Sequence, residues 1–389
     1  MAKGSRCVAA AHPVTPTLVL MGSVGESVQT EAYRSPLLDL PGAVATDAPA
    51  GAIDAALDAG VAAHYGDPLR EQRQLANGAG FVDLSHRSVV RITGSDRLSW
   101  LHNLTTQSLE RLAPGVGSQA LILSPQGHVE HHLQLVDDGE AVWIHVEPAD
   151  AQSLVDFLTS MRFMLRVEVE DVTADWTVVW EPILKPHTTL LTRVDPQRDD
   201  VAGRQVIVAR TDLLAFATSA DRTGPPAGVL ALEALRVAAG RPRFGLETDH
   251  RTIPHELGWI GTAVQLDKGC YRGQETVARV VNLGRPPRRL VRLHLDGSAR
   301  EVLPVRGSEV MRAGDDADVI GRVTSAAYHY ELGPVALAVV KYATADDAAV
   351  LVRTSDVDVP ATMDAIVERD SGPRPGQVAR AAFRTLGVR

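Results

Sequence analysis

Cysteine is scarce in this sequence, because only Cys7 and Cys270 carry a thiol among 389 residues. Two distant thiols are too few for a disulfide framework or a cysteine-rich metal site, which indicates a reducing compartment. No run of 18 apolar residues occurs, so no membrane-spanning helix is predicted. His12, Pro13 and Pro16 interrupt the apolar start that a signal peptide would need. We therefore expect a soluble, cytoplasmic protein without a membrane partner.

The charge balance offers no general excess of basic residues. With 39 basic and 48 acidic side chains the formal net charge is -9, which argues against a surface that coats nucleic acid, although a local basic groove stays open. Hydrophobic residues make up 45% and charged residues 22%, as in globular proteins. The length predicts two or three domains.

Local patterns predict a chain in which strands and helices alternate. We expect a poorly ordered arm over 1–50, a loop over 185–204 and a mobile tail over 371–389. Helices are predicted over 67–75, after Gly94 with Ser95 as its cap, over 148–160, over 229–239 and over 276–280. Strands are predicted over 88–93, 120–123, 129–136, 143–146, 167–172 and 176–180. Short β runs over 290–295, 319–324, 335–340, 350–352 and 363–367 predict a small barrel or sandwich.

The most informative segment is KGCYRGQE, residues 268–275. Gly269 and Gly273 allow a tight turn that presents Cys270 before a helix N-terminus. The positive end of the helix dipole, with Lys268 and Arg272, would stabilise a thiolate, so these three residues are the candidate catalytic group. The alternative is a buried cysteine that acts as a small hydrophobic side chain.

The string KGCYRGQETVAR resembles the KGCYxGQE signature of the YgfZ family of folate-binding, iron–sulfur-related proteins. The wider superfamily includes the aminomethyltransferase, or T-protein, of glycine cleavage. Further blocks resemble that superfamily: HYGDPLREQ, FVDLSHRSVVRITGSDRLSWLHNLTTQ, LSPQGHVE and ALRVAAGRPRFGLETDHRTIPHELGW. The resemblance covers most of the chain apart from the N-terminal arm and the C-terminal tail.

The resemblance implies an α+β fold, a three-domain T-protein-like ring around a tetrahydrofolate cleft. The implied parts are a discontinuous folate-binding central domain over 51–121 and 226–288, a ferredoxin-like α+β domain over 122–225 and a C-terminal β-barrel over 289–370. The cofactor implied is tetrahydrofolate or a related folate.

The function implied is support of iron–sulfur cluster assembly or repair, and thereby of tRNA modification. Iron–sulfur enzymes or assembly factors are the implied partners, with tRNA as a further candidate. Two alternatives stay open: a tetrahydrofolate-dependent aminomethyltransferase or demethylase, and a non-enzymatic scaffold for a protein or tRNA.

Gln107 departs from the aminomethyltransferase pattern. In those enzymes the corresponding block reads Thr-Asn-Asp, with the Asp near the reacting folate nitrogen, whereas this chain has Thr105-Thr106-Gln107. A glutamine cannot ionise, which counts against ordinary aminomethyl transfer. Its amide can still bond a pterin edge, so Gln107 stays a candidate folate ligand.

Glu233 and Arg236 are candidates for the pterin and the glutamate tail of folate, because carboxylates pair with a guanidine-like edge and guanidinium groups with carboxylates. The alternative is a simple helical ion pair. The signature adds further candidate cofactor-binding residues, namely Tyr271, Gly273, Gln274 and Glu275. Weaker candidates are Glu247, Asp249 and Glu256.

Two sets of polar residues can each be interpreted either as a functional site or as residues without a functional role. His128, Glu130 and His132 share one face of a predicted strand, where they could ligate a metal, but a solvated or cleft-facing hairpin is the default and we assign no metal. A cluster of arginines is either solvated surface or an anion site: Arg285, Arg288, Arg289 and Arg292.

Overall fold

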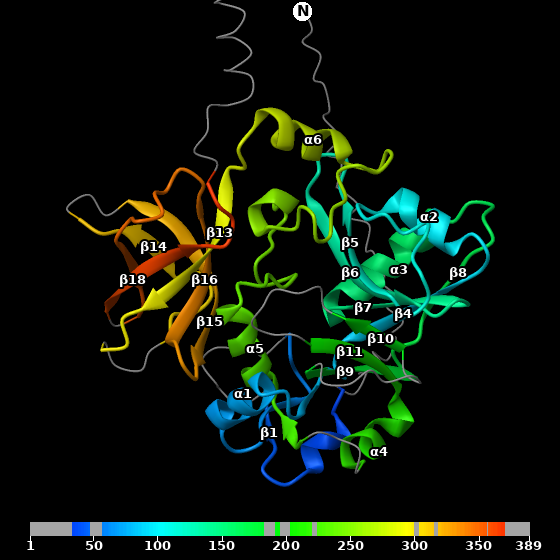
Figure 1. Ribbon diagram of the computed structural model, residues 1–389, viewed down its shortest axis with the longest axis horizontal. Helices are drawn as coiled ribbons and strands as arrows, with labels where there is room; N and C mark the ends of the chain where they lie inside the picture. Colours follow the sequence, from blue (N-terminus) through cyan, green and yellow to red (C-terminus); the bar gives the residue numbers. More distant parts are fainter. Residues whose placement is uncertain are drawn as a thin grey trace, which may run out of the picture. The chain divides into compact units, whose positions relative to one another are not determined.

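The computed structural model describes residues 33–46, 57–182, 191–194, 203–219, 224–298, 303–314, 318–355 and 357–369. Over these ranges the strands form two five-stranded sheets, a closed barrel and one two-stranded pair (Figure 1). The pair is β1 (Val44–Ala45) with β2 (Ala62–His64). The short 3-10 helices are η1 (Pro36–Asp39), η2 (Pro148–Asp150), η3 (Arg210–Asp212) and η4 (Pro254–Leu257).

The first five-stranded sheet has the order β10-β11-β9-β3-β12. Its strands are β3 (Phe81–Asp83), β9 (Trp176–Pro182), β10 (Leu191–Val194), β11 (Gly203–Ala209) and β12 (Pro226–Ala227). Only the β3–β12 pair is parallel, and it joins segments far apart in the sequence. Three helices accompany this part: α1 (Pro68–Ala76), α4 (Leu213–Thr218) and α5 (Val229–Ala238). Leu75 of α1 and Leu235 of α5 share a core with Val178 of β9, so both helices cover the sheet.

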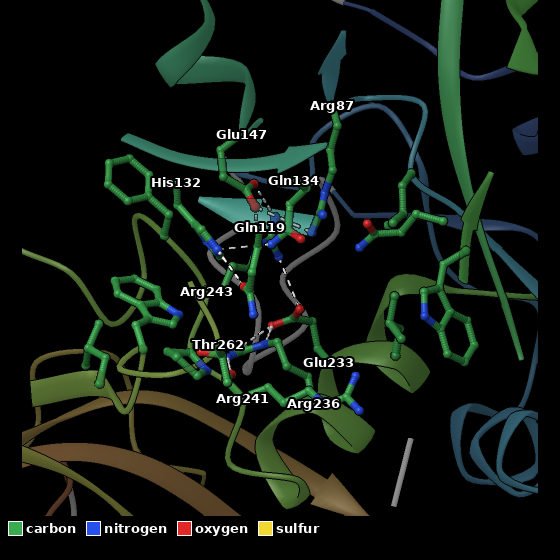
Figure 2. A pocket seen from close by; sticks show the side chains of 18 of the residues that line it. Arg87, Gln119, His132, Gln134, Glu147, Glu233, Arg236, Arg241, Arg243 and Thr262 are labelled. Atoms are coloured by element: carbon green, nitrogen blue, oxygen red, sulfur yellow. Dashed lines mark hydrogen bonds and ion pairs between the residues drawn. The ribbon is translucent and has the colours of Figure 1, made fainter. Parts of the chain in front are cut away.

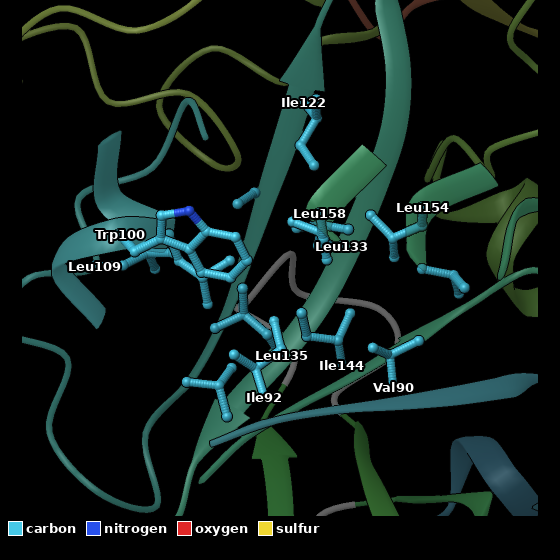
Figure 3. Packing of buried hydrophobic residues seen from close by; sticks show 14 of the residues in the cluster. Val90, Ile92, Trp100, Leu109, Ile122, Leu133, Leu135, Ile144, Leu154 and Leu158 are labelled. Carbon is cyan, nitrogen blue, oxygen red and sulfur yellow. The ribbon is translucent and has the colours of Figure 1, made fainter. Parts of the chain in front are cut away.

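The second sheet has the order β5-β6-β7-β4-β8 and is antiparallel throughout. Its strands are β4 (Ser88–Thr93), β5 (Gly117–Leu123), β6 (Val129–Asp137), β7 (Ala141–Val146) and β8 (Glu168–Asp171). Two helices, α2 (Arg97–Leu104) and α3 (Ala151–Ser160), supply the other side of its core. Figure 3 shows Trp100 of α2 and Leu154 of α3 with Ile92 and Leu133 of the sheet.

The C-terminal part is a closed six-stranded barrel in the order β13-β16-β15-β14-β17-β18. Its strands are β13 (Arg288–Leu295), β14 (Glu309–Arg312), β15 (Val319–His329), β16 (Gly333–Lys341), β17 (Val350–Arg353) and β18 (Asp358–Ala365). β18 pairs with β13, which removes the open edge that a sandwich would leave. This confirms the α+β class and the C-terminal β-barrel.

Several local predictions need correction. Asp96, not Ser95, is the N-cap of α2, because Ser95 Oγ donates to Asp96 Oδ1 at 3.3 Å instead of capping the helix. The expected loop over 185–204 contains β10 and the start of β11. These two strands pair with each other, although their sequences do not alternate clearly between polar and apolar residues. Strands β1, β2, β3, β11, β12 and β14 and helix α4 were not predicted.

The expected terminal segments are only partly described. Residues 33–46, assigned to the poorly ordered arm, form η1 and β1, while the remainder of the arm and the tail over 371–389 lie outside the described residues. Both five-stranded sheets take strands from each side of residue 122. The three-domain division therefore stays a prediction. In the described ranges no helix combines the length and apolar character needed to cross a bilayer.

Candidate functional site

A cavity of about 230 Å³ lies beside α5, β5, β6 and the segment 241–262 (Figure 2). Its apolar walls are aromatic at Trp180, Phe244 and Trp259 and aliphatic at three leucines, Leu84, Leu232 and Leu257. The polar lining consists of four arginines, two glutamates, three glutamines, a histidine and a threonine: Arg87, Arg236, Arg241, Arg243, Glu147, Glu233, Gln119, Gln134, Gln205, His132 and Thr262. Positively charged, negatively charged and flat aromatic side chains thus line the same cavity.

Arg243 is the centre of a buried ion network at this cavity. Its guanidinium donates to Asp58 at 2.8 and 3.0 Å and to Glu147 at 2.7 and 2.9 Å, and lies 3.3 Å from Glu233. Only 4% of the Arg243 side chain is exposed. The pairs among the drawn residues are dashed in Figure 2.

The network changes the ionisation of its members. Burial alone would raise the pKa of Glu147, but attraction to Arg243 and Arg87 outweighs it and lowers that pKa to about 2. The same competition between burial and Arg243, with help from His86, lowers the pKa of Asp58. Both carboxylates are therefore charged at neutral pH.

Glu233 and Arg236 both line the cavity. They also form the helical ion pair of the alternative interpretation, at 2.8 Å. The guanidinium of Arg236 donates further to Glu247, to the carbonyl of Arg241 and to Ser325 Oγ of the barrel, at 2.7 to 3.0 Å. Four of its five N–H donors meet acceptors, and the remaining one lies on Nη2, 2.8 Å from Glu233, so Arg236 ties α5 to β15.

His132 connects the second sheet to the cavity. Its Nε2 lies 2.9 Å from Gln119 Oε1, and its ring lies 4.8 Å from that of Trp259. Glu130 of the same strand face pairs with Arg272, and His131, on the opposite face, lies 2.6 Å from Asp150. Among the described residues no cluster of three ligands could hold a metal ion.

Gln107 lies next to the cavity rather than in it. Its Nε2 donates to the carbonyls of Thr262 at 2.9 Å and Gln119 at 3.3 Å, and both of these residues line the cavity. Its Oε1 accepts from the backbone N–H of Ser108. All parts of this amide are engaged with the backbone, so the side chain braces the wall.

Two polar atoms of the cavity wall have no hydrogen-bond partner in the described part of the chain. They are Oε1 of Gln134, an acceptor, and Nε of Arg87, a donor. Within the described ranges Arg87 has one ion pair, with Glu147 at 3.4 Å. Buried polar atoms are normally paired, so an occupant with its own donors and acceptors would suit this wall.

The structure places Cys270 at the surface, as an exposed free thiol outside the cavity lining. The ammonium group of Lys268 has partners other than Cys270. The Lys268 ammonium is buried and donates to the carbonyls of Thr105 and His102 and, at 3.2 Å, to that of Gln107. Burial lowers the pKa of Lys268 to about 8. Lys268 therefore clamps the cysteine loop onto the end of α2.

The second predicted cation is also engaged elsewhere. Arg272 donates to Glu130 at 2.8 Å and lies over the ring of Phe157 at 5.4 Å. The suggested stabilisation of a thiolate by Lys268 and Arg272 thus stays a prediction, since both cations have other partners.

Gly273 is the N-cap of α6 (Gln274–Leu283) and has φ +81°. A Cβ there would lie 2.6 Å from the carbonyl oxygen of Ser124, in the turn between β5 and β6. Only glycine combines this left-handed conformation with such a close approach. The start of α6 is therefore locked against the hairpin turn.

The remaining residues of the signature have structural contacts. Tyr271 is buried in an apolar cluster, where burial raises its pKa to about 12. Gln274 Nε2 donates weakly to the carbonyl of Lys268 at 3.5 Å, and Glu275 is exposed and pairs with Arg279. None of these residues lines the cavity, so their role in folate binding stays a prediction.

The other charged candidates are used inside the chain. Arg288 pairs with Asp249 and Glu256, and Arg292 pairs with Asp364. Arg289 is fully buried and pairs with Asp346. These contacts favour internal pairing over an anion site at the three arginines, while Arg285 is exposed.

Sequence reasoning missed the central residues of the site. Asp58, Glu147 and Arg243 are separated by up to 185 residues in the chain, so no local spacing signals their meeting. The available hint was the position of Arg243 between Gly240 and Gly245 in a block that carries the resemblance.

Two family models match the chain. One, described as GCVT N-terminal domain, covers residues 62–180, which include β3 to β7, and the other, Glycine cleavage T-protein C-terminal barrel domain, covers residues 288–365. The second range coincides with the six barrel strands.

Similar proteins agree with these matches. A protein of Arabidopsis thaliana named "Putative transferase At1g60990, chloroplastic" is 26% identical over 60% of this chain, and the match spans only 61% of that relative. An aminomethyltransferase of Rubrobacter xylanophilus is 27% identical over 68% of this chain and 79% of its own length. The crystal structure of aminomethyltransferase T from Bartonella henselae matches with a TM-score of 0.65 at 18% identity, over 77% of this chain and 89% of that one. This last likeness concerns the fold alone.

Proposed function

The chain belongs to the glycine cleavage T-protein superfamily, and we propose that it binds tetrahydrofolate or a related folate in the cavity beside α5. The observation that carries the proposal is the joint presence of indole surface from Trp180 and Trp259 with unpaired polar atoms at Gln134 and Arg87. A pterin offers a flat ring for the first and a donor and acceptor edge for the second.

The size and chemistry of the cavity suit one end of a folate. At about 230 Å³ the hollow is smaller than the 300 to 1,000 Å³ typical of pockets that enclose whole drug-sized ligands, so it would take the bicyclic ring and leave the tail outside. Gln134 Oε1 would accept from the ring, and Arg87 would pair with a carboxylate of the tail. Arg236, with its donors engaged, would shape the wall.

A titration with tetrahydrofolate tests this proposal. Calorimetry should show saturable binding by the full chain, at least tenfold weaker in Gln134→Leu and in Arg87→Met. Arg91→Met is the matched control, because Arg91 lies in an exposed pair with Glu170 away from the cavity. Absence of saturable binding, or equal weakening in the control, would contradict a folate site here.

We further propose that the protein supports iron–sulfur enzymes in the manner implied by its YgfZ-like signature, with Cys270 as the reactive group and tRNA modification as a dependent process. The exposed position of the Cys270 thiol supports this role, because a partner can reach it. One thiol cannot hold a cluster alone, so its chemistry would be transfer or protection with a partner protein. The scarcity of cysteine supports a cytoplasmic location.

The variant Cys270→Ser tests the role of the thiol separately from folate binding. Folate binding should be unchanged in the variant, while the activity of cluster-dependent enzymes in cells that carry it should fall. Unaffected enzyme activities would contradict the role of the thiol and leave the folate site standing.

Aminomethyl transfer is the second candidate, favoured by the relatives named aminomethyltransferases and by the shared fold. The amide of Gln107 opposes it, because its atoms bond backbone groups and cannot carry charge. Folate-dependent release of formaldehyde equivalents from aminomethyl donors would establish this activity.

The scaffold alternative gains support from the engagement of Lys268 and Arg272 with other partners. Alkylation kinetics decide it. A Cys270 that reacts no faster than a free model thiol at neutral pH would favour a scaffold without thiol chemistry.

A further inference from the structure

A loop joins α3 to β8 (Figure 1). Three consecutive apolar side chains of this loop are exposed. Phe163 is 81% exposed, Met164 98% and Leu165 44%. Single exposed apolar residues are ordinary, but a contiguous patch marks an interaction site more often than chance. Together these side chains offer on the order of 400 Å² of apolar surface.

The base of this loop is held firmly. Trp100, whose ring lies in the core shown in Figure 3, donates from Nε1 to the carbonyl of Met161 at 3.1 Å. The carboxylate of Asp96 accepts from the backbone N–H of Arg166 at 2.9 Å and from its guanidinium at 2.8 Å. A Cβ on Gly94 would lie 2.0 Å from the carbonyl oxygen of Arg166, so the two segments touch. With both ends of the loop fixed, its tip has a defined position.

The backbone at the tip is strained. Phe163 has φ +44°, and it is the only non-glycine residue with a positive φ among the described residues. A bulky side chain avoids this conformation, and Phe163 gains no burial in return. Strain that the surrounding fold imposes without a packing gain is characteristic of functional positions. Its effect here is to direct Phe163 and Met164 into solvent.

The charges beside the tip define the partner. Arg162 is exposed and makes no side-chain hydrogen bond or ion pair with the described residues, whereas the charge of Arg166 is balanced by Asp96. An apolar pair beside one unpaired cation is complementary to an apolar socket with a carboxylate at its rim.

Two other occupants fit less well. A bilayer would receive two side chains, although even a whole myristoyl chain gives an association constant of only about 10⁴ M⁻¹. The exposed carboxylate of Glu168 on the adjoining strand would also oppose anionic lipid. A stable dimer needs roughly 800 Å² from each partner, about twice what the tip offers. The area fits a transient contact with another protein.

We propose that residues 162–165 form a preorganised knob that docks into an apolar, carboxylate-edged socket on a transient protein partner. The knob lies outside the cavity lining, so this inference is independent of folate binding. Docking needs no ordering of the loop, because the core already holds its ends.

A photo-crosslinking residue in place of Phe163 should capture one protein in cells, while the same residue in place of the exposed Asn103 of α2 should not. The captured protein is then purified and titrated against the intact chain. The double substitution Phe163→Ser, Met164→Ser should weaken binding at least tenfold. Arg162→Glu should weaken it about fivefold, with recovery when a carboxylate of the socket is changed to lysine.

The variant Phe163→Gly distinguishes a role of Phe163 in partner binding from a role in stability. Glycine adopts the positive φ without strain, so the melting temperature should hold or rise while partner binding is lost. A clear fall in melting temperature would make Phe163 a structural residue and overturn the proposal. Equal capture at positions 163 and 103 would also overturn it.

The alternative occupants have their own outcomes. Binding of the purified chain to vesicles of phosphatidylglycerol and phosphatidylcholine that is lost in the double variant would assign the knob to a membrane. Self-association of the purified chain that is lost in the same variant would assign it to a second copy. Either result would overturn the assignment to a different protein.

Discussion

Replacing Arg243 by methionine should destabilise the fold strongly and in a pH-dependent way. The guanidinium lies among three carboxylates, those of Asp58, Glu147 and Glu233, and only 4% of its side chain is exposed. Methionine fills similar space without charge, so the variant leaves buried carboxylates without their cation. Breaking a buried pair from one side costs about 3 to 5 kcal/mol.

The structure gives an independent magnitude. Burial favours a higher pKa for Glu147, but Arg243 and Arg87 bring it from the usual 4.5 to about 2. This difference corresponds to about 3 kcal/mol of folding free energy at pH 7. Because the folded pKa is lowered, this stabilisation is present above pH 4.5 and is lost as the pH falls from 4.5 toward 2.

The Arg243→Met variant should lack this stabilisation. Without Arg243 the pKa of Glu147 and of Asp58 should rise from its wild-type value, because only Arg87 and His86 then oppose the effect of burial, and ionisation above pH 4.5 no longer stabilises the fold as it does in wild type. The deficit in unfolding free energy relative to wild type should therefore be largest at pH 7 and smaller at pH 4. Urea denaturation followed by tryptophan fluorescence at both pH values measures it.

A surface pair supplies the control for this measurement. Arg91→Met removes an ion pair with Glu170 whose side chains are 36% and 45% exposed, and should cost less than about 1 kcal/mol at either pH. Arg243→Lys keeps the charge without the forked geometry and should fall between the two. A loss in Arg243→Met no larger than in the control, or equal at pH 7 and pH 4, would refute the buried network.

Three further outcomes follow from the local geometry. Gly273→Ala should lose at least about 1 kcal/mol in urea denaturation because of its positive φ and the nearby carbonyl of Ser124, whereas Gly269→Ala, with no atom within 4 Å of its Cβ, should be tolerated; equal losses would contradict the interlock. Gln107→Asp should lower the unfolding free energy by about 1 to 3 kcal/mol, because a carboxylate cannot donate to the carbonyls of Thr262 and Gln119; a neutral result would exclude the brace. Cys270→Ser should change stability by no more than about 0.5 kcal/mol, since the thiol is exposed, and a larger loss would indicate a packing role.

Much of the fold was accessible from local patterns. Pro68 with Asp67 as N-cap starts α1, the turn at Ser124–Gly127 joins β5 to β6, and α5 follows its apolar periodicity. Turn chemistry and periodicity act over a few residues, which is why a single sequence displays them. Strands β10, β11 and β14 were not predicted, because their sequences do not alternate clearly and they depend on neighbouring strands for pairing.

In the candidate site, too, some contacts could be predicted from local spacing and others could not. The spacing of Glu233 and Arg236, three residues apart on one helix, predicted their ion pair, which the structure shows, and both residues also line the cavity. The roles expected for Lys268 and Arg272 depended on proximity to Cys270 in sequence. Their long side chains instead reach acceptors 142 to 166 positions away in the sequence, which local patterns cannot reveal.

By itself the sequence determined the mixed α+β class, the β-rich C-terminal part, the superfamily resemblance and the presence of a cysteine loop before a helix. Only the tertiary structure decided which charges are buried together, where the cavity lies and which cations are already paired. The physical reason is that backbone conformation depends on residues close by in the sequence. An ion pair or a cavity wall instead requires that packing bring distant residues, such as Asp58, Glu147 and Arg243, into contact.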